Sequence, residues 1–281
     1  MSDFKGAMFL AEQIAREAGE LILRGERDRF GERPEVESTK SSPTDVVTAM
    51  DRAVEDLLRR RLAEARPGDG VLGEEAGLEA GTTGLTWVLD PIDGTVNYLY
   101  RIPSYAVSVG LVTGDPTVPG DWQPVAACVH QPATGDTWTA ASGEGSWLGD
   151  RALRLSPVPE LSQALVGTGF GYRQQRRTGQ ARVLTGVLPK VRDIRRIGSA
   201  ALDLCGVATG TLDAYYERGV NAWDIAAASL VLTEAGGALC GLRGAPPSPE
   251  MVVASADPLL SSLVELLTEL DADTDPALTE G

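Results

Sequence analysis

The chain of 281 residues is predicted to fold as a layered α/β sandwich. Two helical patterns open the sequence, short apolar strand patterns follow from Val71 to about residue 149, and strands alternate with helices after Arg151. Strands placed between pairs of helices favour stacked sheets and helical layers. We expect an N-terminal α+β half at residues 1–155 with a mostly antiparallel sheet, and a C-terminal α/β half at residues 156–270.

The first two elements are predicted to be helices, over residues 5–29 and from about Asp45 to Ala65. Residues 30–44 are polar and broken by two prolines, which favours a loop or a short hairpin. The expected buried side chains are Phe9, Leu10, Ile14, Ala18, Leu21 and Ile22 in the first helix, and Val46, Val47, Met50, Val54, Leu57, Leu58 and Leu62 in the second.

Short apolar runs then predict strands at 71–73, 86–89, 105–113, 125–130 and 137–141. The last of these strands and a turn over 143–149 suggest a meander or hairpin. The second half is expected to hold strands at 164–168, 193–197, 214–217, 238–242 and 251–255. Its helices are expected at 175–188, 199–209, 222–235 and 258–270. The acidic residues 271–281 are expected to form a disordered tail.

Composition limits the classes of partner. The chain has 25 Lys+Arg against 40 Asp+Glu, a net charge of −15, so we expect no nucleic-acid partner, because binding to phosphate backbones needs a basic face. No apolar run is long enough for a spanning helix or a signal peptide, so no membrane partner is expected. Three scattered cysteines favour a reducing, cytoplasmic location.

A single histidine, His130, excludes most histidine-dependent hydrolases, and its place at the end of an apolar strand favours a structural role. No cysteine is followed six residues later by arginine, and no GxxxxGK loop occurs. Thiol-phosphatase and P-loop chemistry are therefore disfavoured.

The segment from Trp87 to Thr95 carries the most specific chemical pattern. A buried strand ends in Asp90 and Asp93, three residues apart, followed by Gly94 and Thr95. Carboxylates suit hard cations, and free amide N–H groups at a following helix turn suit phosphate oxygens. The alternative is that the two aspartates only cap a turn.

Other acids follow buried segments or lie on helices. Glu74 and Glu75 end the strand at 71–73, and each alone would be interpreted as a surface acid. Asp51 would be a surface acid of the second helix, and Asp224 an ordinary first-turn acid favoured by the helix dipole.

Four segments taken together resemble the inositol monophosphatase family: Lys40–Asp51, Gly73-Glu74-Glu75, Asp90-Pro91-Ile92-Asp93-Gly94-Thr95 and Trp223-Asp224. The order and spacing match from about residue 5 to residue 270. The resemblance implies a five-layer αβαβα sandwich of the inositol monophosphatase and fructose-1,6-bisphosphatase type. It also implies a magnesium-dependent, lithium-sensitive phosphomonoesterase that forms a homodimer.

The resemblance also implies a site with two to three Mg²⁺ per subunit. One ion would be held by Glu74, Asp90 and the Ile92 carbonyl, and a second by Asp90, Asp93 and Asp224. Water would attack directly after activation by the metal. The residues implied for the water and its orientation are Asp51, Glu75 and Thr95.

Substrate contacts are implied at a further set of residues: Gly94, Thr95, Ser199, Ala200, Glu217 and Asp224. The alternative for Glu217 is a strand-end acid that forms a salt bridge with Arg218 or another cation. Eight Lys/Arg between Arg173 and Arg196 are interpreted mainly as a solvated face, with a basic patch for a polyanion left open.

The expected substrate is inositol 1-phosphate or a similar sugar or polyol phosphate, a small phosphate monoester. Histidinol phosphate, fructose 1,6-bisphosphate and 3′-phosphoadenosine phosphates are alternatives within the same chemistry. A regulatory binding protein with secondary catalysis is the alternative from another class.

Overall fold

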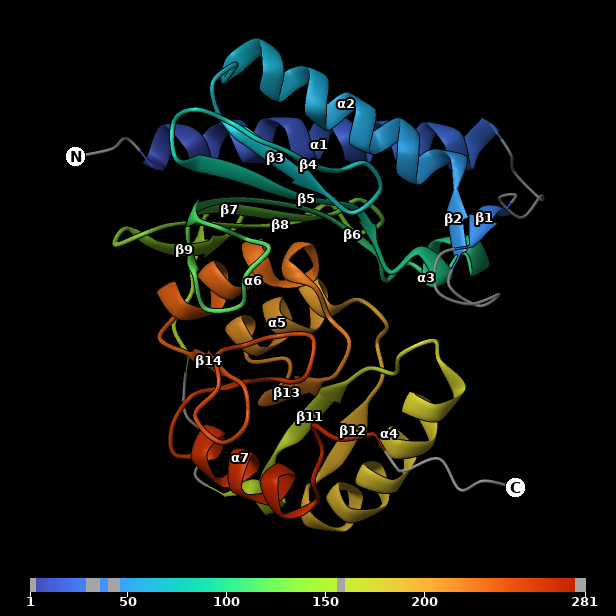
Figure 1. Cartoon of the computed structure of the whole chain (residues 1–281), viewed down its shortest axis with the longest axis vertical. Coiled ribbons are helices and arrows are strands. Elements are labelled where there is room, and N and C mark those ends of the chain that lie inside the picture. Colours follow the sequence, from blue (N-terminus) through green and yellow to red (C-terminus); the bar gives the residue numbers. More distant parts are fainter. Residues whose placement is uncertain (1–3, 29–35, 40–45, 156–159, 276–281) are drawn as a thin grey trace.

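Five layers make up the molecule, and the αβαβα sandwich is confirmed (Figure 1). The computed structural model describes residues 4–28, 36–39, 46–155 and 160–275. An eight-stranded and a five-stranded sheet alternate with three helical layers. From the N-terminal side these layers are α1 (Phe4–Asp28) with α2 (Ala49–Ala65), α5 (Ala200–Thr209) with α6 (Ala222–Glu234), and α4 (Gln174–Val187) with α7 (Leu259–Glu269).

The eight-stranded sheet is antiparallel except where β3 runs parallel to β5. Its order is β10-β9-β8-β7-β6-β5-β3-β4. The strands are β3 (Gly70–Gly73), β4 (Gly77–Glu79), β5 (Leu85–Asp93), β6 (Ala106–Gly114), β7 (Trp122–Gln131), β8 (Asp136–Ala141), β9 (Gly145–Leu148) and β10 (Arg151–Ala152). The meander or hairpin suggested at 137–149 is confirmed, because β8 and β9 pair antiparallel there; the connecting turn is shorter than 143–149, since residues 145–148 form β9.

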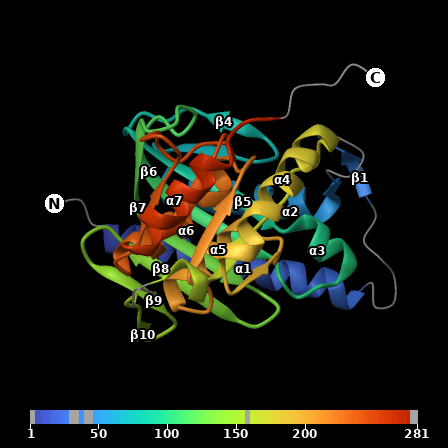
Figure 2. The ribbon, with the colours of Figure 1, turned by 90° about the horizontal axis from the view of Figure 1, so that it is seen from below.

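The five-stranded sheet has the order β12-β11-β13-β15-β14. Its strands are β11 (Leu165–Thr168), β12 (Asp193–Arg195), β13 (Ala214–Glu217), β14 (Ala238–Cys240) and β15 (Val252–Ser255). β11 is parallel to both β12 and β13, and the remaining pairs are antiparallel. All five strands coincide with the apolar runs that predict them. In the view from below, α4 and α7 form the layer nearest the viewer (Figure 2).

The start of the second helix differs from the prediction. Residues Val46–Thr48 form β2, which pairs antiparallel with β1 (Val36–Thr39), so the alternative of a short hairpin is confirmed. The helix begins at Ala49 because the Thr48 side chain caps it, and Asp51 returns a hydrogen bond to the Thr48 amide. Phe9 of the first helix is 60% exposed, contrary to the prediction, because Ala7, Met8 and Ala11 form the buried face there.

The two helices of the middle layer are buried between the two sheets. All residues of α5 from Ala200 to Ala208 are buried, because sheets cover both sides of this helix. Helix α6 is likewise buried from Ile225 to Leu232. The N-terminal ends of both helices therefore lie between the two sheets. None of the described helices is long and apolar enough to span a membrane.

The acidic segment after α7 is folded as far as the structure describes it. Arg243 pairs with Asp271 and Asp273, and Arg218 pairs with Asp275. These ion pairs are contrary to the disorder expected for residues 271–275. The rest of the predicted tail, 276–281, lies outside the described residues.

Three short helical elements complete the described fold. The first, α3 (Thr95–Tyr100), directly follows β5, as the sequence predicts for a helix turn at Thr95. The others are single 3₁₀ turns at Leu161–Gln163 and Leu188–Lys190. The division near residue 155 falls between the strands of the two sheets, but α5 and α6 pack on the first sheet and the second alike. A division into two domains therefore stays a prediction.

Candidate active site

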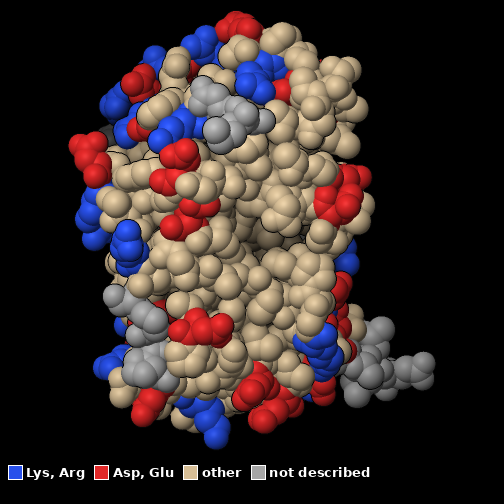
Figure 3. All heavy atoms as spheres, turned by 90° about the vertical axis from the view of Figure 1, so that its left-hand side faces the viewer, with Lys and Arg blue, Asp and Glu red and all other residues tan. Residues whose placement is uncertain are grey.

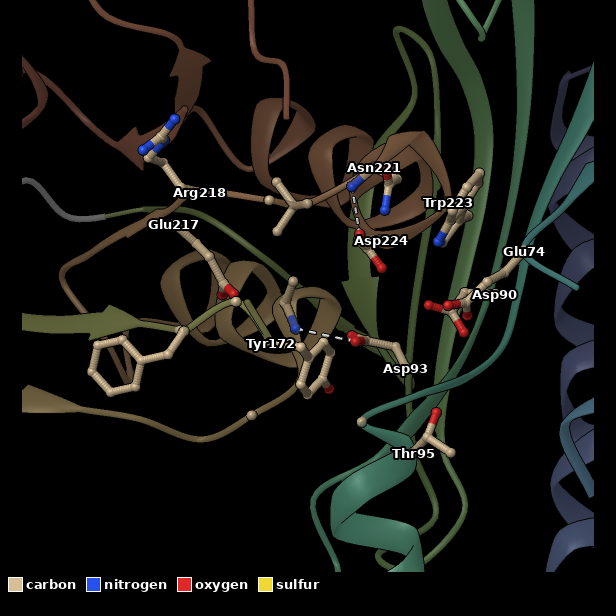
Figure 4. A pocket seen from close by; sticks show the side chains of 18 of the residues that line it. Glu74, Asp90, Asp93, Thr95, Tyr172, Glu217, Arg218, Asn221, Trp223 and Asp224 are labelled. Carbon is tan, nitrogen blue, oxygen red and sulfur yellow. Dashed lines mark hydrogen bonds between the residues drawn. The ribbon is translucent and has the colours of Figure 1, made fainter. Parts of the chain in front are cut away.

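A cavity of about 520 Å³ opens between the end of β5, the N-terminus of α6 and the end of β13. Carboxylates, glycines and arginines share its wall. The predicted residues that line it are Glu74, Asp90, Ile92, Asp93, Gly94, Thr95, Ala200, Glu217 and Asp224. Figure 4 shows Glu74, Asp90, Asp93 and Asp224 converging on one space, with Glu217 and Tyr172 across the cavity.

Three of these acids form the tightest group. Asp90, Asp93 and Asp224 each present a carboxylate oxygen within 4.8 Å of the other two. Burial and the nearby charges of Asp93 and Glu74 raise the pKa of Asp224 well above its usual value. Carboxylates forced together in this way call for a cation between them, and hard divalent cations prefer such oxygen ligands.

Asp90 and Asp93 diverge from the strand because pairing between β5 and β6 is irregular between them. Asp90 remains in the paired part of β5, opposite Ser108 of β6, and its Oδ1 accepts a hydrogen bond from the Ile92 amide (3.0 Å). Gly94 has a φ of 97°, and a Cβ there would lie 3.0 Å from the Ser104 carbonyl. The turn that carries Asp93 into the cavity therefore requires glycine.

The N-terminus of α5 holds Asp93. Its Oδ2 accepts the Ser199 hydroxyl and the Ala201 amide, both at 2.6 Å, and its Oδ1 accepts the Ala200 amide at 3.3 Å. Burial raises the pKa of Asp93 to about 6, while these donors lower it. The prediction that Ser199 contacts substrate is wrong: it is 1% exposed, and its hydroxyl positions Asp93.

Asp224 does act as a first-turn acid of α6, because its Oδ2 accepts the Asn221 amide in a capping box. It also faces the other two aspartates, so the structural and the chemical interpretation both hold. Capping fixes the side-chain rotamer and leaves the other carboxylate oxygen available to the cavity.

Asp51 is only 1% exposed, contrary to the surface position that its own helix pattern would suggest. Its Oδ1 accepts the Thr95 hydroxyl at 3.2 Å, and that hydroxyl also lies 3.1 Å from the Ile92 carbonyl. Asp51 and Thr95 are thus brought together as predicted. Asp51 itself lies behind Thr95, outside the cavity lining.

The turn carrying Glu74 and Glu75 is held by a residue that sequence reasoning missed. Glu55 of α2 is 1% exposed and accepts the amides of Glu75 (2.8 Å) and Ala76 (3.0 Å). Arg59 donates to Glu55 (2.8 Å) and to the Gly77 carbonyl (2.6 Å). Glu74 lines the cavity, whereas Glu75 does not.

A signal for Glu55 was present in the sequence. Residues 51, 55, 58 and 62 lie on one face of α2, and Leu58 and Leu62 are buried there. Two acids on an apolar helix face must find buried partners, because an unpaired carboxylate would be costly to bury.

Glu217 accepts the Tyr215 hydroxyl at 2.8 Å and lies against Gly169, where a Cβ would come within 1.9 Å of its Oε2. Burial raises its pKa to about 7. The alternative pairing with Arg218 is wrong, because that guanidinium binds Glu250 and Asp275 instead.

Asp203 on α5 was not identified from the sequence. It is fully buried, and both its carboxylate oxygens lack a hydrogen-bond partner among the residues described. Burial and the nearby charge of Glu217 raise its pKa well above the usual value. His130 is buried against Thr137 (2.8 Å), far from the cavity lining, in agreement with a structural role.

Comparison with known proteins agrees with this site. The family model described as inositol monophosphatase family matches residues 7–273. Inositol-1-monophosphatase of Mycobacterium bovis is 51% identical over 242 residues, 81% of each chain. Nus factor SuhB of Xylella fastidiosa is 37% identical over 243 residues, 86% of this chain and 84% of the relative. The structure of Mycobacterium tuberculosis SuhB matches with a TM-score of 0.80 at 41% identity, covering 98% of this chain and 100% of that one.

The fold and the family match thus define a phosphatase, and its cavity holds a cluster of three acids whose oxygens are close enough together to bind a metal ion. The chain belongs to the inositol monophosphatase family.

Proposed function

We propose that the protein is a magnesium-dependent phosphomonoesterase that hydrolyses inositol 1-phosphate or a similar polyol phosphate to the alcohol and inorganic phosphate. The observation that carries this proposal is the group Asp90, Asp93 and Asp224 within 4.8 Å, placed in a cavity beside the Thr95 hydroxyl. The family membership supports the same chemistry.

The donor set fits magnesium. Glu74, Asp90 and the Ile92 carbonyl would hold one ion, and Asp90, Asp93 and Asp224 a second. Only oxygen donors are offered, as Mg²⁺ requires, and the repulsion that raises the pKa of Asp224 is relieved when a cation binds. A third, weaker ion at Glu74 completes the proposed two to three per subunit. When bound, the ions would activate water and neutralise charge on the phosphoryl group.

The chain's own groups orient the reactants. Because the Thr95 hydroxyl donates toward Asp51 Oδ1, its lone pairs are free to accept a proton from the attacking water. Asp51 is then the proposed base, with Thr95 between it and the water. The amides of Gly94 and Thr95 are proposed to hold phosphate oxygens, and Glu75 to hold water at the edge of the site. No phosphoenzyme is needed.

The substrate's alcohol is proposed to contact Glu217 and Ala200. Glu217 can accept hydrogen bonds from two neighbouring hydroxyls of a polyol, which favours inositol 1-phosphate over a simple aryl phosphate. Histidinol phosphate, fructose 1,6-bisphosphate and 3′-phosphoadenosine phosphates stay as alternatives for the same site.

The first experiment measures phosphate release from myo-inositol 1-phosphate with Mg²⁺ and with chelator. We expect turnover only with Mg²⁺, and inhibition by lithium. Release that is unaffected by chelator would contradict the proposed metal chemistry. Absence of release from every phosphate monoester tested would contradict the proposed function as a whole.

A regulatory role is the second candidate, favoured by the likeness to a Nus factor. The face shown in Figure 3 carries acidic and basic side chains interspersed, so any such partner would not be recognised by a uniform basic surface there. If deletion of the gene for this protein impairs the partner's function, and an Asp93→Asn protein restores that function, a regulatory role is favoured over catalysis.

We further propose a homodimer, on the strength of the family resemblance alone. Light scattering at micromolar concentration tests it, and a monomeric mass would contradict it.

A further inference from the structure

Four arginines border the same cavity, and the chemistry proposed above uses none of them. Arg173 and Arg176 lie at the start of α4, Arg196 follows β12, and Arg218 follows β13. Arg173, Arg176 and Arg196 come from the stretch that the sequence presents as a solvated basic face. Their position on a cavity wall gives them access to a bound ligand.

Arg218 is already neutralised and is 5% exposed. Its guanidinium pairs with Glu250 at 3.0 Å and with Asp275 at 2.7 Å, and points away from the metal-binding acids (Figure 4). It therefore serves the structure around β13 and offers no charge to a ligand.

Arg176 has an unmet hydrogen-bonding capacity. Its Nε is buried and, among the residues the structure describes, has no hydrogen-bond partner; the nearest carboxylate oxygen, on Asp275, is 4.0 Å away. The guanidinium lies over Gly219, where a Cβ would approach Nη1 to 2.9 Å. A buried guanidinium N–H without an acceptor is costly, and an anion in the cavity would supply one.

Arg196 also lines the cavity. A Cβ on Gly198 would come within 2.3 Å of its Nη1, and its charge lowers the pKa of both Asp93 and Glu217. Its neighbour Arg195, by contrast, pairs with Asp193 at 2.6 Å. Within the described ranges, neither Arg196 nor Arg173 forms an ion pair.

The cavity keeps positive charge beyond the metal-binding acids. Two divalent cations would offset four of its acids (Glu74, Asp90, Asp93 and Asp224), and, Arg218 aside, the lining then holds three arginines against one further carboxylate, that of Glu217. The volume of about 520 Å³ lies within the range of about 300–1,000 Å³ in which pockets hold drug-sized ligands, well beyond one phosphate group.

We propose that Arg173, Arg176 and Arg196 form a subsite for a second anionic group, a phosphate or a carboxylate, on the substrate whose phosphate is cleaved at the carboxylate cluster. This rests on the proposed phosphatase function and predicts, within its substrate class, a preference for polyol phosphates that carry a second anionic group. Arginine suits the task because its planar fork binds either anion through two N–H groups.

Matched substrates test the subsite. Fructose 1,6-bisphosphate is compared with fructose 1-phosphate, and 6-phosphogluconate with glucitol 6-phosphate, by kcat/KM with Mg²⁺ and by calorimetric binding. We expect a preference for the doubly anionic member of about 10–100-fold, the range for charge-assisted hydrogen bonds. Which pair shows the larger preference tells phosphate from carboxylate.

Variants assign the preference to these arginines. Arg173→Gln, Arg176→Gln and Arg196→Gln should each lower the preference about tenfold, mainly through KM, whereas Arg173→Lys should keep part of it. Arg177→Gln, on the same helix, and Arg195→Gln are controls outside the cavity lining and should leave it unchanged. Circular dichroism checks that each variant is folded.

Equal kcat/KM and equal binding for both members of both pairs would overturn the subsite while leaving the phosphatase intact. A preference that the controls reduce as much as the cavity variants would overturn it as well. If no substrate is hydrolysed, the proposed function fails, and tighter, arginine-dependent binding of the doubly anionic member still supports the subsite.

Discussion

The two ends of the cavity are built in different ways. At the carboxylate end, each acid is fixed by buried donors: Asp93 by α5, Asp224 by its capping box, and Glu74 indirectly through Glu55. At the arginine end, long side chains from α4 and from the segment after β12 reach the cavity with few fixed partners. Rigid placement suits metal ions, whose ligands need defined geometry, whereas adaptable cations suit the variable part of a substrate.

The largest effect on turnover is expected from a substitution at the carboxylate end of the cavity. Asp93→Asn removes one charge from the cluster but keeps the side-chain size, so turnover should fall by about 10²–10⁴-fold through loss of transition-state stabilisation. Phosphate release at saturating Mg²⁺ measures it. Asp56→Asn, an exposed acid of α2, is the matched control. Near wild-type turnover of Asp93→Asn would refute the metal assignment.

A second change tests whether the rigid end depends on Glu55. Glu55→Ala removes a buried carboxylate and leaves the amides of Glu75 and Ala76 without an acceptor and Arg59 without its main partner, so the free energy of unfolding should fall by about 2–4 kcal/mol. The Mg²⁺ concentration for half-maximal activity should rise as Glu74 loses its support.

Urea denaturation and a Mg²⁺ titration measure these two effects. Glu64→Ala, which removes an exposed ion pair on the same helix, should change the unfolding free energy by less than about 1 kcal/mol. An unchanged Mg²⁺ requirement in Glu55→Ala would show that the turn holds Glu74 without this contact.

Glu217 lies between the carboxylate end and the arginine end of the cavity, and its replacement tests whether this region contacts the substrate's alcohol. Glu217→Gln should raise KM for inositol 1-phosphate by the equivalent of about 1–3 kcal/mol, because hydrogen bonds to a charged acceptor are lost. A simple aryl phosphate should be much less affected. Equal losses on both substrates point to a damaged metal site, and no loss on either makes Glu217 structural.

The smallest expected effect is the pH dependence of the metal-free protein. Burial raises the pKa of Asp93 to about 6 and that of Glu217 to about 7, above their unfolded values. The folded chain therefore binds protons more tightly than the unfolded chain. Stability from these groups is complete below about pH 4 and is lost as the pH rises to about 7.

The expected loss is about 1–2 kcal/mol, less than the shifts alone would give, because both groups border the open cavity. Urea midpoints between pH 4 and pH 7.5 with chelator measure it. Added Mg²⁺ should remove the decline, since the cation binds the charged carboxylates. Metal-free stability that rises with pH over this range would contradict the assignment of both pKa values.

The sequence predicted most of the fold because its strands are short, apolar and separated by clear turn signals. Where the prediction was wrong, strand pairing decided: Val46–Thr48 pairs with β1 in a hairpin instead of extending α2. The residues of the Asp90–Thr95 motif, which line the cavity, were identified from residue type and order.

The supporting residues were not identified, because they act through contacts distant in sequence. Ser199 was taken for a wall of the substrate pocket, yet it binds Asp93 across 106 residues. Glu55 and Asp203 show nothing in their local sequence that names a partner. Arg173 and Arg196 could not be told from solvated arginines until the fold placed them on a cavity.

The contact between Asp93 and the start of α5 has a consequence for how the protein is made. During synthesis on the ribosome, Asp90 and Asp93 emerge long before Ser199, Ala201 and Asp224. Until α5 and α6 dock, these carboxylates have neither their amide donors nor their third acidic neighbour. In a nascent chain, the incomplete cluster would therefore bind a cation only weakly. Tight metal binding would follow the late assembly of the middle helical layer.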